Sequence, residues 1–249
     1  MRVLPRPAVS APDRHEQARL LRSWHVEPRL LVLPNAWDVA SAVAFARLPG
    51  CRAIATTSGG VARSLGFDDG AAPGEEMLRV AVRIAEAVEL PVTADLERGY
   101  GDPVATVRAA WSAGIVGANI EDSVGAGVPV LVEEQVELLR AVRAAAPDLV
   151  LNARVDTLLR GGGIAETIER GRAYLEAGAD CVFPITISAR ADVEAVVEDV
   201  GGPVAVMAVP GLPSLDELER FGVARFTWGS ELARQAVAAA SRIAAEALA

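Results

Sequence analysis

The sequence predicts a (β/α)₈ barrel of the TIM type with an extra N-terminal helix. Short apolar runs rich in β-branched residues alternate along the chain with longer amphipathic stretches, a pattern typical of parallel strands covered by helices on both faces. Eight such units fit within 249 residues, a normal length for one barrel. No Gly-x-Gly-x-x-Gly loop follows the first strand, which disfavours the alternative of an open doubly wound sheet.

The expected elements follow in order along the chain. An amphipathic stretch over 12–27 predicts the extra helix before the first strand. Eight apolar runs predict the strands, at 30–34, 52–57, 91–95, 116–121, 149–154, 180–185, 203–209 and 224–229. The clearest helices between them are expected at 74–88, 132–146 and 164–178. No linker or low-complexity segment interrupts this alternation, so we expect a single barrel domain over residues 1–249.

Composition limits the possible locations and partners. Hydrophobic residues make up 51 % of the chain, enough for a large core. No uncharged apolar run approaches the roughly 18 residues of a membrane span, and the first residues lack the features of a signal peptide, so we expect a cytoplasmic protein. The net charge of −9 disfavours nucleic acids and anionic membranes as partners. A small anionic substrate would need local positive charge from Arg or a bound cation.

The absence of Lys, and of His outside the N-terminal segment, excludes several catalytic mechanisms. The chain has no Lys, which excludes a Schiff-base lysine and a Walker-type phosphate loop. Its only histidines, His15 and His25, lie in the N-terminal segment, so a Ser-His-Asp triad would need a group from outside the main body. Cys51 and Cys181 lie far apart in apolar surroundings and are expected as buried free thiols. Carboxylates, Arg, hydroxyls, backbone N–H groups and a metal ion remain for catalysis.

Acidic residues gather at the ends of the middle strands, where a barrel places its chemistry. Asp95 and Glu97 end the third expected strand, and Glu121 ends the fourth. Such a set of hard oxygen ligands suits Mg²⁺, although each acid could instead pair with an Arg or cap a helix. Arg154 ends the fifth strand and could grip a substrate carboxylate, or form an ion pair with Asp95 or Glu121. The segment 99–101 is expected to turn away from the site.

Other polar residues at strand ends are candidates. Ser58, Gly59 and Gly60 follow the second strand, where backbone N–H groups could approach an anionic oxygen, although Ser-Gly-Gly is also a common loop sequence. Asp69 could cap a helix or join the metal network. Asp102 precedes a proline and is better placed to cap the next helix than to join the acids.

Six stretches together resemble the phosphoenolpyruvate mutase/isocitrate lyase superfamily, in particular its short members. They are "LPNAWDVASA" (33–42), "AIATTSGGVARSLGFDDG" (53–70), "PVTADLERGYGD" (91–102), "GANIEDS" (117–123), "LNARVDTLL" (151–159) and "WGSELAR" (228–234). The resemblance runs from about residue 17 to the end of the chain. It implies a barrel that binds Mg²⁺, or Mn²⁺, at its strand ends and acts on a small 2-oxo or 2-hydroxy acid through an enolate-like intermediate.

The resemblance also implies roles for the residues already singled out. Asp95 would bind the metal, Glu97 and Glu121 would hold its waters, and Asp69 would complete that network near the substrate. Arg154 would bind the substrate carboxylate or help the reacting group. Three residues would support the enolate oxygen and a carboxylate: Ser58, Gly59 and Gly60. A homo-oligomer, tetramer or dimer, is implied as well, with the helix at 230–249 exchanged between subunits; an ordinary eighth barrel helix fits that segment equally well.

The loop after the fourth strand departs from the larger members of the superfamily. Isocitrate and methylisocitrate lyases carry a Lys-Lys-Cys-Gly-His motif there, whereas this chain has "EDSVGAGVPVLVEEQ" (121–135), with no Lys, Cys or His. The Lys and Asn of the mutase are also missing, which leaves Ser123 as the acid/base side chain. We therefore expect an Mg²⁺-dependent lyase or hydrolase that cleaves a C–C bond. The alternatives are a phosphoenolpyruvate/phosphonopyruvate C–P mutase or hydrolase, and a non-catalytic barrel that binds an oxo acid.

Overall fold

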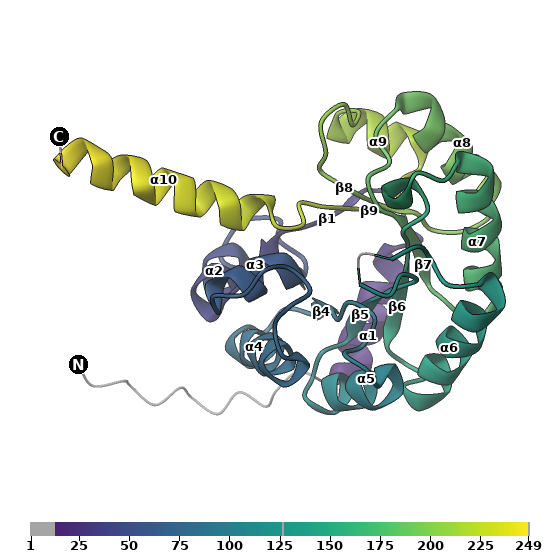
Figure 1. Ribbon diagram of the computed structural model, residues 1–249, viewed down its shortest axis with the longest axis horizontal. Helices are drawn as coiled ribbons and strands as arrows, with labels where there is room; N and C mark the ends of the chain where they lie inside the picture. The colour runs from purple at the N-terminus through teal and green to yellow at the C-terminus, as the bar shows by residue number, and fades with distance from the viewer. Residues whose placement is uncertain (1–12, 126, 249) are drawn as a thin grey trace.

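The computed structural model describes residues 13–125 and 127–248, and the chain forms the expected barrel in this range (Figure 1). The first strand is bent at Pro34 into two segments, β1 (Leu31–Leu33) and β2 (Asn35–Ala36). β1 pairs with β9 (Arg225–Thr227), and β2 pairs with β3 (Ile54–Thr56), in both cases in parallel. The first strand therefore joins the end of the ring to its beginning.

The other strands complete the ring in sequence order. Hydrogen-bonded neighbours run β2-β3-β4-β5-β6-β7 on one side and β1-β9-β8 on the other. A parallel bridge between Val182 and Val204 connects β7 to the segment just before β8. The remaining strands are β4 (Val92–Asp95), β5 (Gly117–Glu121), β6 (Val150–Val155), β7 (Cys181–Pro184) and β8 (Ala205–Met207). Each expected strand thus overlaps an observed one, and the predicted fold class is confirmed.

Helices surround the ring on its outer face (Figure 1). They are α2 (Val39–Ala46), α3 (Ser58–Ser64), α4 (Gly74–Ala87), α5 (Pro103–Ser112), α6 (Val132–Ala145), η1 (Leu158–Arg160), α7 (Ile164–Glu176), α8 (Arg190–Val200) and α9 (Leu215–Phe221). Helix α5 begins as predicted, because the Asp102 carboxylate accepts a hydrogen bond from the Ala105 N–H at 2.9 Å and Pro103 occupies the first turn. This cap explains Asp102 without a role in the acid cluster of Asp95, Glu97, Glu121 and Asp69.

The extra N-terminal helix, α1 (Arg14–Trp24), covers the end of the barrel where the strands start. Its residues Ala18 and Leu21 are fully buried and pack in one cluster with Leu31 and Val150 from the starts of strands. The helix is shorter than the expected 12–27, and residue 12 lies outside the described residues. Because α1 closes this end, the carboxyl ends of the strands form the accessible face of the barrel.

Beyond its first turn, which lies against β2, the C-terminal helix α10 (Glu231–Leu248) extends away from its own barrel (Figure 1). Its apolar side chains Val237, Ile243 and Leu248 are between 66 % and 87 % exposed. The interpretation of 230–249 as an ordinary eighth barrel helix is therefore wrong. No helix among the described residues is both long and apolar enough to cross a membrane.

A polar layer fills the middle of the barrel beneath the strand ends. The Arg225 side chain is only 1 % exposed and its Nη2 lies 3.4 Å from Asn119 Oδ1. Strands β9 and β5 are not neighbours in the sheet, so this contact crosses the barrel interior. Asn152 Nδ2 donates to the same oxygen at 2.8 Å. Burial lowers the pKa of Arg225 to about 10. Barrel interiors are usually filled by branched apolar side chains, so this polar layer was not predicted from the sequence.

Candidate active site

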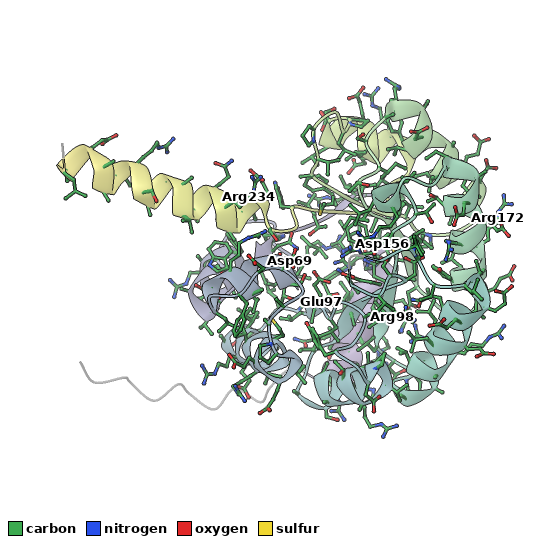
Figure 2. The ribbon with its side chains drawn as sticks, in the orientation of Figure 1. Asp69, Glu97, Arg98, Asp156, Arg172 and Arg234 are labelled. Carbon is green, nitrogen blue, oxygen red and sulfur yellow. The ribbon has the colours of Figure 1, made fainter. Side chains whose placement is uncertain are left out.

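An open cavity of about 990 Å³ lies at the carboxyl ends of strands β3 to β6. Its lining contains five of the eight predicted site residues: Ser58, Asp69, Glu97, Glu121 and Arg154. Figure 2 shows Asp69, Glu97 and Asp156 around the opening of the barrel, whereas Arg172 lies on the outer face. The structure therefore brings together residues that are up to 96 positions apart in the sequence, from Ser58 to Arg154.

Asp95, at the end of β4, is held in place from one side. Its N–H donates to Thr56 Oγ1 at 2.9 Å. Its Oδ2 accepts hydrogen bonds from the Ser58 N–H at 3.1 Å and from the Ser58 hydroxyl at 2.7 Å. Its Oδ1 is buried and has no hydrogen-bond partner among the described residues. A buried carboxylate oxygen without a donor is costly, and a bound cation is one partner that would satisfy it.

The neighbouring acids share one desolvated region. Burial, followed by the charge of Asp95, raises the pKa of Asp69. Burial together with the charges of Asp95 and Asp69 raises the pKa of Glu97 to about 7. Burial raises the pKa of Glu121 to about 8, although the Arg154 charge acts in the opposite direction. Carboxylates crowded in this way favour either protonation or a bound cation.

Glu97 has an unusual backbone conformation. Its φ of +50° lies in the left-handed region that few residues other than Gly adopt. The Glu97 carbonyl accepts a hydrogen bond from the Glu121 N–H at 2.9 Å, which ties the chain just after β4 to the end of β5. Strained backbone of this kind is concentrated at functional sites, where the surrounding structure maintains it.

The segment 99–101 forms a turn, as predicted, with positive φ at all three residues. The turn nevertheless keeps Tyr100 at the site. The tyrosine lines the cavity, and its hydroxyl donates to the Asp95 carbonyl at 3.4 Å. Tyr100 was not among the predicted site residues, and its only sequence signal is its position between two glycines.

Arg154 is fixed by two carboxylates. Its Nη1 forms an ion pair with Glu121 Oε1, and its Nε donates to Asp156 Oδ1 at 2.6 Å. Asp156 is completely buried, and its N–H donates to Asp122 Oδ1 at 2.8 Å. The ion pair to Glu121, one of the two expected alternatives for Arg154, is thus present alongside its position at the cavity wall.

Asp122 is a supporting residue that the sequence analysis did not assign. Besides the Asp156 N–H, it accepts a hydrogen bond at its Oδ2 from the Tyr174 hydroxyl at 2.8 Å. Arg170 Nη1 lies 3.4 Å from the same oxygen. These partners are 48 and 52 positions away in the sequence, so no local pattern could identify them.

The amides at the start of α3 are largely engaged within the protein. The Ser58 N–H donates to Asp95, and the Gly60 N–H donates to Thr57 Oγ1 at 3.3 Å. Gly60 therefore belongs to the helix cap and is not part of the cavity lining. This differs from the expectation that all three residues 58–60 face an anionic oxygen.

Gly59 is required by the close approach of an acid. A Cβ atom at this position would lie 2.7 Å from Asp69 Oδ2 and 2.8 Å from Ser230 Oγ. The absence of a side chain at Gly59 thus allows the Asp69 carboxylate to lie over the start of α3, beside Asp95. The expected association of Asp69 with the acid cluster is supported by this geometry.

Another part of the cavity wall is formed by α6 and the loops after β5 and β6. Apart from Ser123, its residues were not singled out in the sequence. They include Val124, Glu134, Glu137, Leu138, Leu159 and Arg160. Arg98, from the loop after β4, joins this wall through its ion pair with Glu134. The sequence feature that could have pointed to Arg160 as a cavity residue is its position six residues after Arg154.

The arrangement fits a magnesium ion that is coordinated by few protein ligands and keeps several of its waters. Within residues 13–125 and 127–248, no group of three or more His, Cys, Asp or Glu side chains forms a ready-made metal cage. Mg²⁺ commonly uses only one or two protein carboxylates and keeps several waters. The open Asp95 oxygen, with Glu97, Glu121 and Asp69 around it, meets this requirement.

The comparison with known families identifies the relationship. Residues 21–248 match the family model described as phosphoenolpyruvate phosphomutase. The chain belongs to the phosphoenolpyruvate mutase/isocitrate lyase superfamily. Relatives of this chain carry the names of carbon–carbon lyases, hydrolases and phosphomutases, and those with named substrates act on small carboxylates.

Solved structures of the superfamily share the fold. A candidate lyase or mutase from Burkholderia cenocepacia has a TM-score of 0.88 and 38 % identity, covering 94 % of this chain and 88 % of its own. A 2,3-dimethylmalate lyase has a TM-score of 0.84 and 31 % identity, covering 93 % and 87 %. An oxaloacetate acetylhydrolase with bound oxalate has a TM-score of 0.84 and 27 % identity, covering 92 % and 85 %.

Sequence relatives include named enzymes of the superfamily. An uncharacterised Mycobacterium tuberculosis protein is 36 % identical over 205 residues, covering 80 % of this chain and 77 % of its own. The 2-methylisocitrate lyase of Escherichia coli is 37 % identical over 159 residues, covering 57 % and 53 %. The 2,3-dimethylmalate lyase of Eubacterium barkeri is 35 % identical over 169 residues, covering 62 % and 58 %.

Proposed function

We propose that this chain is an Mg²⁺-dependent lyase or hydrolase that cleaves a C–C bond in a small 2-oxo or 2-hydroxy carboxylate through an enolate-like intermediate. The observation that carries the proposal is the buried, unpartnered Oδ1 of Asp95, next to Glu97 and Glu121, whose pKa values are raised. Similarity to lyases of methylisocitrate and dimethylmalate and to a hydrolase of oxaloacetate supports it.

The acidic residues would hold the metal ion. Asp95 would coordinate Mg²⁺, or Mn²⁺, through its open oxygen, while Ser58 fixes its other oxygen. Glu97, Glu121 and Asp69 would accept hydrogen bonds from the waters of the ion. When bound, the ion supplies Lewis-acid polarisation of the substrate's 2-oxygen. The cation also makes the ionised state of these crowded carboxylates favourable.

Arg154 would bind the substrate carboxylate beside the metal. Its hydrogen bond to the buried Asp156 sets the orientation of the guanidinium before the substrate arrives, and such preorganisation lowers the cost of binding. Its other contact is the ion pair with Glu121. Ser58 and Gly59 would lie near the enolate oxygen, at the start of α3.

The short loop after β5 favours a water-dependent reaction. It closes on itself through a bridge between Ser123 and Pro129 and a hydrogen bond from the Val130 N–H to the Asp122 carbonyl at 2.8 Å. Residues 123–130 contain no Lys, Cys or His, so a proton supplied from this loop would come from water or from Ser123. The match to a phosphomutase family favours one second candidate, a phosphoenolpyruvate/phosphonopyruvate mutase or hydrolase.

A substrate panel tests the proposal. The purified protein with Mg²⁺ is assayed against oxaloacetate, malate-type acids and phosphonopyruvate, with products identified by proton and phosphorus NMR. Carbon–carbon cleavage is expected, and it should be lost in Asp95→Ala and Arg154→Ala with circular dichroism unchanged. Unchanged turnover in both variants would remove this site from the reaction. Phosphorus rearrangement would establish the second candidate, and oxalate binding without any turnover would indicate a non-catalytic barrel.

We further infer that the protein forms a homo-oligomer, a tetramer or dimer, in which α10 packs on another copy. The exposed apolar side chains of α10 (Val237, Ile243 and Leu248) support this inference, because isolated surface helices rarely expose such residues without a partner. Light scattering should give a multiple of 26.0 kDa. A variant that ends before Glu231 should form a smaller assembly with fewer copies of the chain. A monomeric full-length chain would refute the inference.

A further inference from the structure

We propose that Ser123 and Arg160 form a second carboxylate subsite, which selects substrates with a carboxylate distant from the reacting carbon. This inference rests on the proposed function, in which Arg154 and the metal hold the first carboxylate. Ser123 and Arg160 both line the cavity, which Asp69 and Ser58 also line.

Arg160 is anchored by backbone and side-chain hydrogen bonds but keeps free hydrogen-bonding capacity. It ends η1, and its backbone N–H donates to the Asp156 carbonyl at 3.0 Å, which links it to the residue that orients Arg154. Its Nη2 donates to the Gly125 carbonyl at 2.8 Å. Its Nε is buried and has no partner among the described residues. No described carboxylate lies within ion-pair distance of Arg160, and a buried guanidinium nitrogen left without an acceptor is unfavourable.

Ser123 supplies a second free donor on the same wall. The residue is completely buried, yet its hydroxyl has no partner within the described part of the chain. Gly125, which accepts from Arg160, lies two positions further along the same loop. The loop therefore brings the hydroxyl of Ser123 and the guanidinium of Arg160 to one region. A hydroxyl and a guanidinium N–H together match the two oxygens of a carboxylate.

The charges on this wall leave Arg160 available for a substrate. Arg98, the other cation of the wall, is paired with Glu134 at 2.8 Å and with the Gln135 side chain at 2.7 Å. Arg154 is paired with Glu121 and Asp156. Of the three arginines that line the cavity, Arg160 is therefore the one whose side chain binds no carboxylate and donates only to a backbone carbonyl. A substrate with two separated carboxylates would satisfy Arg154 and Arg160 together, whereas a monocarboxylate would satisfy only the former.

Two ligands of different length distinguish binding at this subsite from binding at the metal site. Oxalate, the product bound by the similar oxaloacetate acetylhydrolase, consists of two directly bonded carboxylates and carries no distant one. The inhibitor 3,3-difluorooxaloacetate of the same enzyme carries a distant carboxylate. Binding of each is measured by calorimetry with Mg²⁺ for the full-length wild type, Arg160→Gln, Arg160→Lys and Ser123→Ala. Arg172→Gln is the matched control, because Arg172 is exposed on α7 and lies outside the cavity.

We expect Arg160→Gln to weaken 3,3-difluorooxaloacetate binding by about 10- to 100-fold, the range for a lost charged hydrogen bond, and to leave oxalate binding unchanged. Arg160→Lys should recover part of the loss, Ser123→Ala should weaken the longer ligand only, and Arg172→Gln should change neither. Equal loss for both ligands would show that Arg160 only anchors the loop, and would overturn the subsite. Undiminished binding of the longer ligand would overturn it too, while the proposed function stands. A wild type that binds neither ligand would refute the proposed function and the subsite together.

Discussion

Replacing Gly59 by Ala separates the geometry of the site from the stability of the barrel. The added Cβ would lie 2.7 Å from Asp69 Oδ2, 2.8 Å from Ser230 Oγ and 2.9 Å from Asp69 Cγ. Real Cβ atoms do not occur at such distances, so these side chains must move. The clashing atoms are the ends of short polar side chains, and Asp69 lies in the loop between α3 and α4 rather than on a strand. We therefore expect Asp69 to move out of the acid cluster while the barrel remains folded.

The expected magnitudes follow from two opposing terms. Ala is favoured over Gly inside a helix by about 1 kcal/mol, whereas overpacking costs about 1–3 kcal/mol. Because the clashing atoms can move, the net change in the free energy of unfolding should stay within about 1 kcal/mol. Gly163→Ala is the matched control, since a Cβ there meets no atom within 4 Å and φ is negative.

The assay combines denaturant unfolding with Mg²⁺ titration and turnover. Gly59→Ala should lower Mg²⁺ affinity and kcat/KM by at least about tenfold, corresponding to about 1.4 kcal/mol, and Gly163→Ala should change neither. Asp69→Asn should give a similar loss, and the double variant should lose little more, because both changes remove the same carboxylate from the site. Wild-type Mg²⁺ affinity and turnover in a folded Gly59→Ala protein would refute the reasoning.

Three further changes test other parts of the structure. Asp95→Asn should abolish Mg²⁺ binding in calorimetry but leave the thermal midpoint unchanged or raised, because it neutralises one of several crowded acids; retained Mg²⁺ binding would contradict this. Burial lowers the pKa of His25 from 6.5 to about 4, so its neutral form is favoured in the folded state. The associated stability is present above pH 6.5 and is lost as the pH falls toward 4, by up to about 3 kcal/mol. The dependence of the free energy of unfolding on pH across this window should become weaker in His25→Gln but not in the exposed control His15→Gln. Equal slopes in the two variants would contradict the role given to His25. Tyr174→Phe should cost about 1.5–3 kcal/mol, since the Asp122 carboxylate loses a buried 2.8 Å hydrogen bond; a loss below 0.5 kcal/mol in urea unfolding would show that the bond contributes little.

The sequence alone determined the barrel and the acidic strand ends. Alternation of apolar and amphipathic segments is a local property that survives into the fold, because parallel strands buried on both faces must be apolar. Since strand ends meet at one face of a barrel, the positions of Asp95, Glu121 and Arg154 could be predicted before any contact was known. The capping role of Asp102 was also local and is confirmed.

Only the tertiary structure decided how these residues are held and what faces them. The approach of Asp69 to Gly59, the support of Asp122 by Tyr174 and the contact of Arg225 across the barrel all join segments distant in sequence. Their side chains meet because the ring closes, and no period or spacing in the sequence encodes that meeting. The same holds for Arg160, which reaches the cavity wall only through the packing of two loops. The direction of α10 is likewise a matter of packing, since its composition suits its own barrel or another copy equally well.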